Sequence, residues 1–353
     1  MVKLKDIARE TGLTISTVSK ALNNSHEISA ETTKRVINAA EALGYRMKRS
    51  FEKQERKTIG AIIPEVRSHT YAEMLHALSA EAARQGYMLI TVLTDSFTHD
   101  VASYIERMLQ HGLDGLFINS VAGLTPVAQK LLRDNNIPAV VLKNIDTDEL
   151  YGIDSICIKD TAAIRLAVDH LIELGHTQIG FLGEKLSFIR CEAFLEAMKQ
   201  HNLEVNPAFV KQGHERFEEG GYLRALELLK EPELPTAVLT SYDQVAYGAT
   251  RAFLEHGLRI PEDISIIGYD NVDQSAYYPV PLTSTSNPVE QMGITAVKIL
   301  IDAIQSPRTH VVQSIAMQGR LVVRTSTCPP RVKQQGGTLN NEPEQFADRL
   351  VPD

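Results

Sequence analysis

Short apolar runs alternate with helical segments along residues 58–328, and this alternation limits the possible fold more than any other feature. Such runs are typical of buried strands, and segments such as 71–85, 161–174 and 244–256 have helical periodicity. Strands that alternate with helices form parallel sheets covered by helices on both faces. The runs read IGAII, MLITVL, DGLFI, PAVVL, SICI, QIGFLG, TAVLT and SIIGY.

The region 58–328 is longer than one doubly wound domain usually is. Its length fits an α/β core of two lobes, each built on a doubly wound parallel sheet. In such sheets a ligand binds beside the carboxyl ends of the strands. The sequence therefore predicts a ligand cleft between the lobes, lined by residues that follow the strands.

The first 46 residues have a purely helical pattern. Gly12 ends a first amphipathic segment, a second follows after a short turn, and Gly44 ends a third. Three short helices form a small all-α headpiece, and the first two have the spacing of a helix-turn-helix. The apolar positions that define them are Leu4, Ile7, Ala8, Leu13, Val18, Leu22, Val36, Ile37, Ala40 and Leu43.

The second helix lies in the stretch GLTISTVSKALN and carries side chains suited to DNA. In a helix-turn-helix this helix enters the major groove, where its first residues meet base edges and short hydroxyls hold phosphates. We expect base-edge contacts from Ile15, Ser16 and Lys20, and phosphate contacts from Thr14, Thr17 and Ser19. The alternative is that Thr14 only caps the helix and that the other hydroxyls are ordinary surface groups.

Charge is divided unevenly along the chain. Residues 1–57 contain 12 Lys and Arg against 7 Asp and Glu, whereas the rest contains 24 against 37. This basic segment indicates a polyanionic partner, double-stranded DNA before membrane, although a solvated basic arm is the alternative. Neither a metal nor a cofactor is expected, because the three cysteines, Cys157, Cys191 and Cys328, lack the spacing of a metal site.

Two other classes of protein are disfavoured. A secreted solute receptor would begin with an apolar signal peptide, but charged Lys3, Lys5 and Asp6 stand there, so a cytoplasmic location is expected. No apolar run of about 18 residues could cross a membrane. A doubly wound enzyme would show a Walker loop, a Gly-x-Ser-x-Gly elbow or a His-Glu-x-x-His cluster, and the sequence has none. We expect a binding protein that is not an enzyme.

The N-terminal segment resembles the DNA-binding headpiece of the lactose/galactose repressor (LacI/GalR) family of bacterial transcription regulators; it reads VKLKDIARETGLTISTVSKALNNSHEISAETTKRVINAAEALGYR. IGAIIPEV, LIELGHTQIGFLG, LRIPEDISIIGYDN and PLTSTSNPVEQMG resemble the family's core in the same order, so the resemblance covers residues 2–328. It implies a homodimeric, effector-controlled repressor of carbohydrate genes with the fold of periplasmic sugar receptors. It also implies backbone contacts from Asn23 and His26, and Lys20 stands where arginine is more usual.

The resemblance also implies effector-binding residues. Arg190 and Asp270 match effector-contacting positions, Phe217 matches an aromatic residue that stacks on sugars, and Lys143 stands where relatives often carry aspartate. A polar segment, residues 65–71, replaces the family's apolar Asn-Pro-Phe-Phe stretch. A helix or turn cap is the alternative for Asp243 and Asp270, and a solvated loop end for Lys143. The expected effector residues are Arg67, His69, Tyr71, Lys143, Arg190, Phe217, Tyr242, Asp243 and Asp270.

The charges in this set favour an anionic effector, such as a sugar acid or sugar phosphate. We expect it between Lys143, Arg190 and Asp270, with Arg67 at the cleft mouth. An ammonium can only donate hydrogen bonds, and an anion would relieve two like charges in a closed cleft. A neutral polyol held by Asp270 and Tyr242 is the alternative.

The expected domains are a headpiece at 1–46, a hinge linker at 47–57, an effector-binding and dimerisation core at 58–328 and a disordered tail at 329–353. Within the core we expect one lobe at 58–158 and 289–323 and the other at 159–288 and 324–328. The linker lacks the leucine that relatives insert into the minor groove, which leaves open whether Phe51 or Met47 replaces it. The polar tail argues against the tetramerising helix of some relatives.

Overall fold

The computed structural model describes residues 2–22, 25, 27–45, 57–94, 100–119, 123–143 and 152–331. It divides the chain into two units, residues 1–57 and residues 58–353. Asn23, His26, the expected hinge linker as far as residue 56, and the expected tail from residue 332 lie outside the described residues.

The first unit is a bundle of three short helices. Gly12 has a φ of 68°, a left-handed conformation that allows the tight turn after the first helix. The Ser29 side chain caps the third helix by accepting a hydrogen bond from the Thr32 N–H. The helices are α1 (Leu4–Thr11), α2 (Ile15–Leu22) and α3 (Ala30–Ala42). Their shared core contains Ile7, Ala8, Val18, Ala21, Val36 and Ala40.

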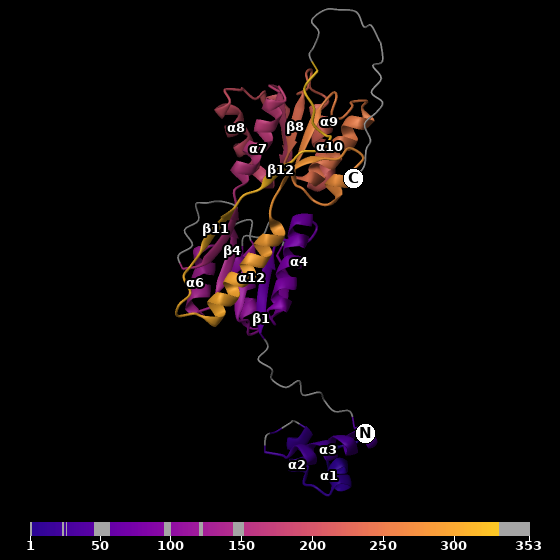
Figure 1. Ribbon diagram of the computed structural model, residues 1–353, viewed down its shortest axis with the longest axis vertical. Helices are drawn as coiled ribbons and strands as arrows, with labels where there is room; N and C mark the ends of the chain where they lie inside the picture. The colour runs from indigo at the N-terminus through magenta and orange to yellow at the C-terminus, as the bar shows by residue number, and fades with distance from the viewer. Residues whose placement is uncertain are drawn as a thin grey trace, which may run out of the picture. The chain divides into compact units, whose positions relative to one another are not determined.

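The first lobe of the core contains a sheet with strand order β11-β5-β4-β3-β1-β2, in which every neighbouring pair is parallel. Helices α4 and α12 pack on one face and α5 and α6 on the other (Figure 1). The strands are β1 (Thr58–Ile63), β2 (Met88–Leu93), β3 (Gly115–Asn119), β4 (Ala139–Lys143), β5 (Asp154–Ile158) and β11 (Ser314–Met317). The helices are α4 (His69–Arg84), α5 (Val101–Leu109), α6 (Pro126–Asp134) and α12 (Val289–Gln305).

The second lobe contains a sheet with strand order β12-β10-β9-β8-β6-β7, and only the β10–β12 pair in it is antiparallel. Helices α7 and α8 cover one face, and α9 and α10 cover the other. The strands are β6 (Ile179–Glu184), β7 (Val210–Gly213), β8 (Ala237–Thr240), β9 (Ser265–Asp270), β10 (Thr283–Ser286) and β12 (Arg320–Val322). The helices are α7 (Asp160–Glu173), α8 (Phe188–Gln200), α9 (Phe217–Leu228), α10 (Asp243–Glu255) and the short α11 (Gln274–Tyr277).

The two mostly parallel sheets with helices on both faces confirm the fold class expected from the sequence. One boundary differs: residues 320–322 form β12 in the second sheet, although the sequence placed residues up to 323 in the first lobe. The reason is that β12 is a partly exposed edge strand of only three residues, too short for the sequence pattern to assign it to a sheet. Among the described helices, none is both long and apolar enough to cross a membrane.

Helices α9 and α10 approach each other closely because both have glycine at their contact. A Cβ atom on Gly221 would lie 1.9 Å from the Val245 carbonyl oxygen, and one on Gly248 would lie 1.9 Å from that of Glu218. No side chain larger than hydrogen fits there without moving a helix. This packing fixes the start of α9, which faces the cleft.

Candidate functional site: the recognition helix and the inter-lobe cleft

The exposed face of α2 is the candidate DNA-binding surface of the first unit. Ile15 is 53% exposed, which is unusual for a large apolar side chain and suits contact with a thymine methyl group. Ser16 and Lys20 are exposed as well, and the Lys20 ammonium pairs with the Glu27 carboxylate. These three side chains point outward, as base contacts require.

The hydroxyls of α2 have local partners. Thr14 Oγ1 accepts a hydrogen bond from the Thr17 N–H at 3.1 Å and lies 2.8 Å from Thr17 Oγ1. Thr14 therefore caps the helix, which is the alternative interpretation given above. A DNA phosphate that bound here would have to share the Thr14 and Thr17 hydroxyls with this cap. Ser19 is partly buried.

A cavity lies between the two lobes of the core, at the carboxyl ends of the strands. Four of the expected effector residues line it: Tyr71, Arg190, Tyr242 and Asp270. The first lobe also contributes Ser68, Thr70, Met74, Leu142 and Ile158. The second lobe also contributes Asp160, Leu186, Ser187, Ile189 and Arg216.

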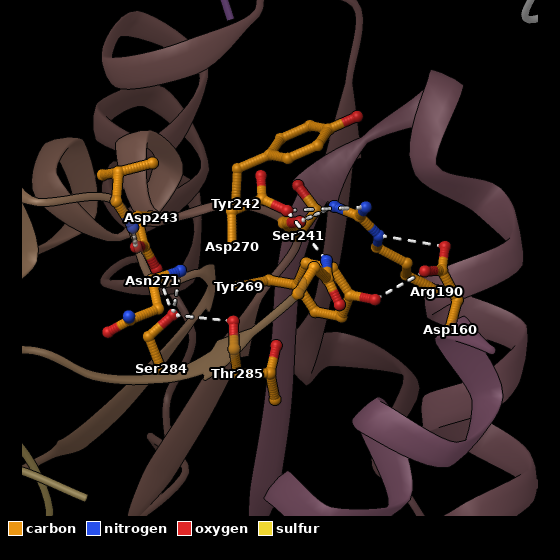
Figure 2. Close-up of polar contacts among 12 residues, drawn as sticks. Asp160, Arg190, Ser241, Tyr242, Asp243, Tyr269, Asp270, Asn271, Ser284 and Thr285 are labelled. Carbon is orange, nitrogen blue, oxygen red and sulfur yellow. Dashed lines mark hydrogen bonds and ion pairs between the residues drawn. The ribbon is translucent and has the colours of Figure 1, made fainter. Parts of the chain in front are cut away.

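Arg190 is the centre of the polar network in this cavity (Figure 2). Its Nε atom donates to Asp160 Oδ2 at 3.3 Å, and its Nη1 atom donates to the Ser241 carbonyl oxygen at 2.6 Å. Its Nη2 atom lies 3.9 Å from Asp270 Oδ1. The guanidinium also lies over the Tyr269 ring, 3.7 Å from its centroid. Two carboxylates therefore already balance the positive charge of Arg190.

Asp270 is held in an unusual state at the end of β9. Its φ is 103°, a conformation that costs energy for any residue except glycine. Burial raises the pKa of this carboxyl to about 6, although Arg190 and hydrogen bonds from Thr70 and Asn287 oppose the rise. Strain and a shifted pKa in a cleft are typical of a ligand-binding residue.

Asp243 was expected to bind effector, but it does not line the cavity. Its carboxylate accepts hydrogen bonds from the Val272 N–H at 2.9 Å and from the hydroxyls of Ser275 and Ser284 at 2.5 Å each. Figure 2 shows it well away from the Arg190 cluster. Asp243 thus joins the start of α10 to β10 and to the loop after β9, which matches its alternative interpretation as a cap.

Replacing Asp243 by alanine is expected to lower the free energy of unfolding by about 3 kcal/mol, because three buried donors lose their acceptor.

Burial raises the pKa of Asp243 to about 7, above its ordinary value. Its contribution to stability is therefore present at low pH and lost as the pH rises through about 7. Asp243→Asn, which does not titrate, should weaken this pH dependence and keep effector affinity. Urea unfolding and calorimetry test both points, and loss of effector binding with unchanged stability would contradict them.

Four other expected effector residues lie outside the cavity lining: Arg67, His69, Lys143 and Phe217. Arg67 lies over the Phe217 ring at 5.2 Å, and His69 Nε2 is 3.3 Å from Gln274 Nε2. Lys143 ends β4 and is partly exposed. Neither residue therefore favours an anionic effector, because Lys143 does not line the cavity and Arg190 is already paired with carboxylates.

The expected set omitted Asp160 and Arg216, both of which line the cavity. Asp160 begins α7 directly after the chain leaves the first sheet at β5, so the strand-end rule could have found it. Arg216 precedes α9 and lies 3.0 Å from the buried Glu184 carboxylate. Nothing in the local sequence separates it from other arginines, because its partners come from distant strands.

Two family models match the chain. Residues 3–47 match "Bacterial regulatory proteins, lacI family", and residues 168–327 match "Periplasmic binding protein-like domain". The chain is 32% identical over 342 residues to the HTH-type transcriptional repressor PurR of Pasteurella multocida (strain Pm70), covering 92% of this chain and 98% of that protein. It is also 32% identical over 334 residues to PurR of Haemophilus influenzae (strain PittEE), covering 91% and 95%.

Solved structures resemble the fold along most of the chain. The lac repressor dimer bound to operator and the anti-inducer ONPF has a TM-score of 0.73 at 26% identity, covering 93% of this chain and 99% of that chain. A LacI family transcriptional regulator from Enterococcus faecium with bound ribose has a TM-score of 0.68 at 28% identity, covering 77% and 99%. The first match includes a headpiece, and the second is to a sugar-bound protein.

Proposed function

The chain belongs to the lacI family of bacterial regulatory proteins, and we propose that it is a homodimeric repressor of carbohydrate genes whose effector is a neutral, hydroxyl-rich sugar. Like its relatives it is a DNA-binding transcriptional repressor with a ligand-binding core, and not an enzyme. Its action on operator DNA assigns it to the cytoplasm.

The outward side chains of α2 support operator reading by Ile15, Ser16 and Lys20. One three-helix headpiece buries too little surface for tight specific binding, so two copies would read a pseudo-palindrome. The similar lac repressor structure is a dimer on its operator.

The pairing of Arg190 is the observation that carries the proposed effector class. The cavity lining contains two arginines, Arg190 and Arg216, and two carboxylates, Asp160 and Asp270. Glu184, 1% exposed, adds a further carboxylate behind Arg216. An anionic ligand would have to displace one of these acids from its cation, whereas sugar hydroxyls can donate to the acids and leave the pairs intact. Tyr71 and Tyr242 offer aromatic surface for the apolar face of a sugar ring.

Calorimetry with matched ligands tests the effector class, after a thermal-shift screen of sugars and sugar acids. We expect a neutral hexose or pentose to bind at least about tenfold more tightly than its uronate and its phosphate, because both arginines of the described cavity lining already pair with carboxylates. Tighter binding of the uronate or the phosphate would contradict the neutral effector and favour an anionic one. Calorimetry on Lys143→Ala would then show whether that lysine binds the added charge.

A further inference from the structure

One short segment of the first lobe makes a series of polar contacts with the second lobe. This segment, residues 65–70, comprises the loop after β1 and the first residues of α4. Arg216 Nη1 lies 3.6 Å from Glu65 Oε1. Two further residues of this segment contact the second lobe. Arg67 contacts Phe217, and His69 contacts Gln274. The second-lobe partners belong to the start of α9 and to α11.

The first-lobe side of this contact is held in place by hydrogen bonds within the first lobe. Glu65 Oε2 accepts hydrogen bonds from the Arg67 N–H and, at 3.1 Å, from the Ser68 N–H. These bonds hold the carboxylate so that its other oxygen faces Arg216. Within the described part of the chain, that buried Oε1 atom has no hydrogen-bond partner, so the ion pair to Arg216 is its main polar contact. An acid held this way loses little side-chain freedom when the lobes meet.

The second-lobe side of this contact is also held by hydrogen bonds within its own lobe. Glu184 accepts from Arg216 Nε at 3.0 Å and from the Phe217 N–H at 2.8 Å. Phe217 has a φ of 58°, a strained value for an aromatic residue, and the Glu184 bond stabilises it. Contacts within the second lobe therefore position the guanidinium of Arg216 at the cleft.

We propose that Glu65 and Arg216 form an inter-lobe latch, and that this latch holds the lobes together over the cavity. Glu65 is a positioning residue: it acts through Arg216 and does not line the cavity. Arg216 and Glu65 are only 18% and 14% exposed, so solvent screens their attraction less than that of a surface pair. A pre-closed cleft also binds its ligand more tightly, because a larger fraction of the protein is competent to bind. That last consequence depends on the proposed function, whereas the latch itself does not.

Fluorescence energy transfer within the core of the full chain tests the latch without any ligand. Dyes are placed at Val127→Cys on α6 and Leu195→Cys on α8, which are 63% and 42% exposed, in a Cys328→Ser background. Cys157 and Cys191 are buried and should not react. Excess unlabelled protein prevents transfer between two copies, and dialysis removes carried-over ligand.

Glu65→Gln keeps an oxygen for the two backbone donors but removes the charge. We expect it to reduce the ratio of closed to open molecules about three- to tenfold. Glu231→Gln is the matched control, because it breaks an ion pair with Lys211 inside the second lobe, 2.5 Å long, and should not change the transfer.

Unchanged distance distributions in Glu65→Gln, with native circular dichroism, would overturn the latch. If Glu65→Gln does not fold, Glu65→Asp decides, because its shorter side chain keeps the charge but draws the carboxylate back from Arg216. The absence of binding to any sugar would contradict the proposed effector and leave the latch result standing.

Discussion

Replacing Arg190 by alanine is expected to abolish effector binding and to lower the free energy of unfolding by about 3–5 kcal/mol. The substitution leaves Asp160 and Asp270 at the cavity without their cation, and both side chains are largely buried. It also leaves the Ser241 carbonyl oxygen without the Arg190 donor at 2.6 Å. Urea unfolding followed by circular dichroism measures the loss of stability, and calorimetry with the neutral sugar measures the loss of effector binding.

Two comparisons make this result specific. Arg251→Ala removes an arginine that is 70% exposed and pairs with Glu255 on the same helix, so its cost should stay below about 0.5 kcal/mol. Arg190→Ala combined with Asp160→Asn should recover part of the lost stability, because one uncompensated charge is gone. If Arg190→Ala kept full effector affinity, the cavity at the inter-lobe cleft would not be the effector site.

Removing residues 1–57 is expected to reduce operator affinity by at least about a thousandfold, which is the usual margin between specific and non-specific binding. The operator is first selected from genomic fragments with the full chain. Because the two units have separate cores, the truncated protein should keep its effector affinity. Affinity of the full chain should also fall steeply with salt, as phosphate contacts require. Anisotropy measurements that show undiminished operator binding by residues 58–353 would contradict the assignment of α2.

Lys20 provides a finer test of the same surface. Lys20→Ala should cost about 1–3 kcal/mol on the selected operator and much less on random DNA, because a base contact discriminates and a phosphate contact does not. Glu27→Gln should strengthen binding to both, since it removes the acid that pairs with Lys20 in the free protein. An equal loss on operator and random DNA would make Lys20 a phosphate contact.

The boundaries of most elements could be read from the sequence because local chemistry sets them. Gly12 and Ser29 mark a helix end and a helix start, and fully buried strands such as β1 are continuous apolar runs. Strand β10 had no such signal. It reads TSTS, yet Thr283 and Ser284 are fully buried, and residues distant in sequence, Ser326 and Asp243, are partners of their polar atoms.

The sequence by itself determined that a basic helix-turn-helix precedes a two-lobed α/β core, because periodicity and charge are properties of neighbouring residues. It also placed candidate binding residues at the strand ends. Only the tertiary structure decided which of them meet. Asp243 and Asp270 both follow strands, but one is enclosed by donors from β10 and α11, whereas the other faces Arg190. The pairing of Glu65 with Arg216 likewise joins segments from different lobes, and local patterns carry no information about contacts made across such distances in the chain.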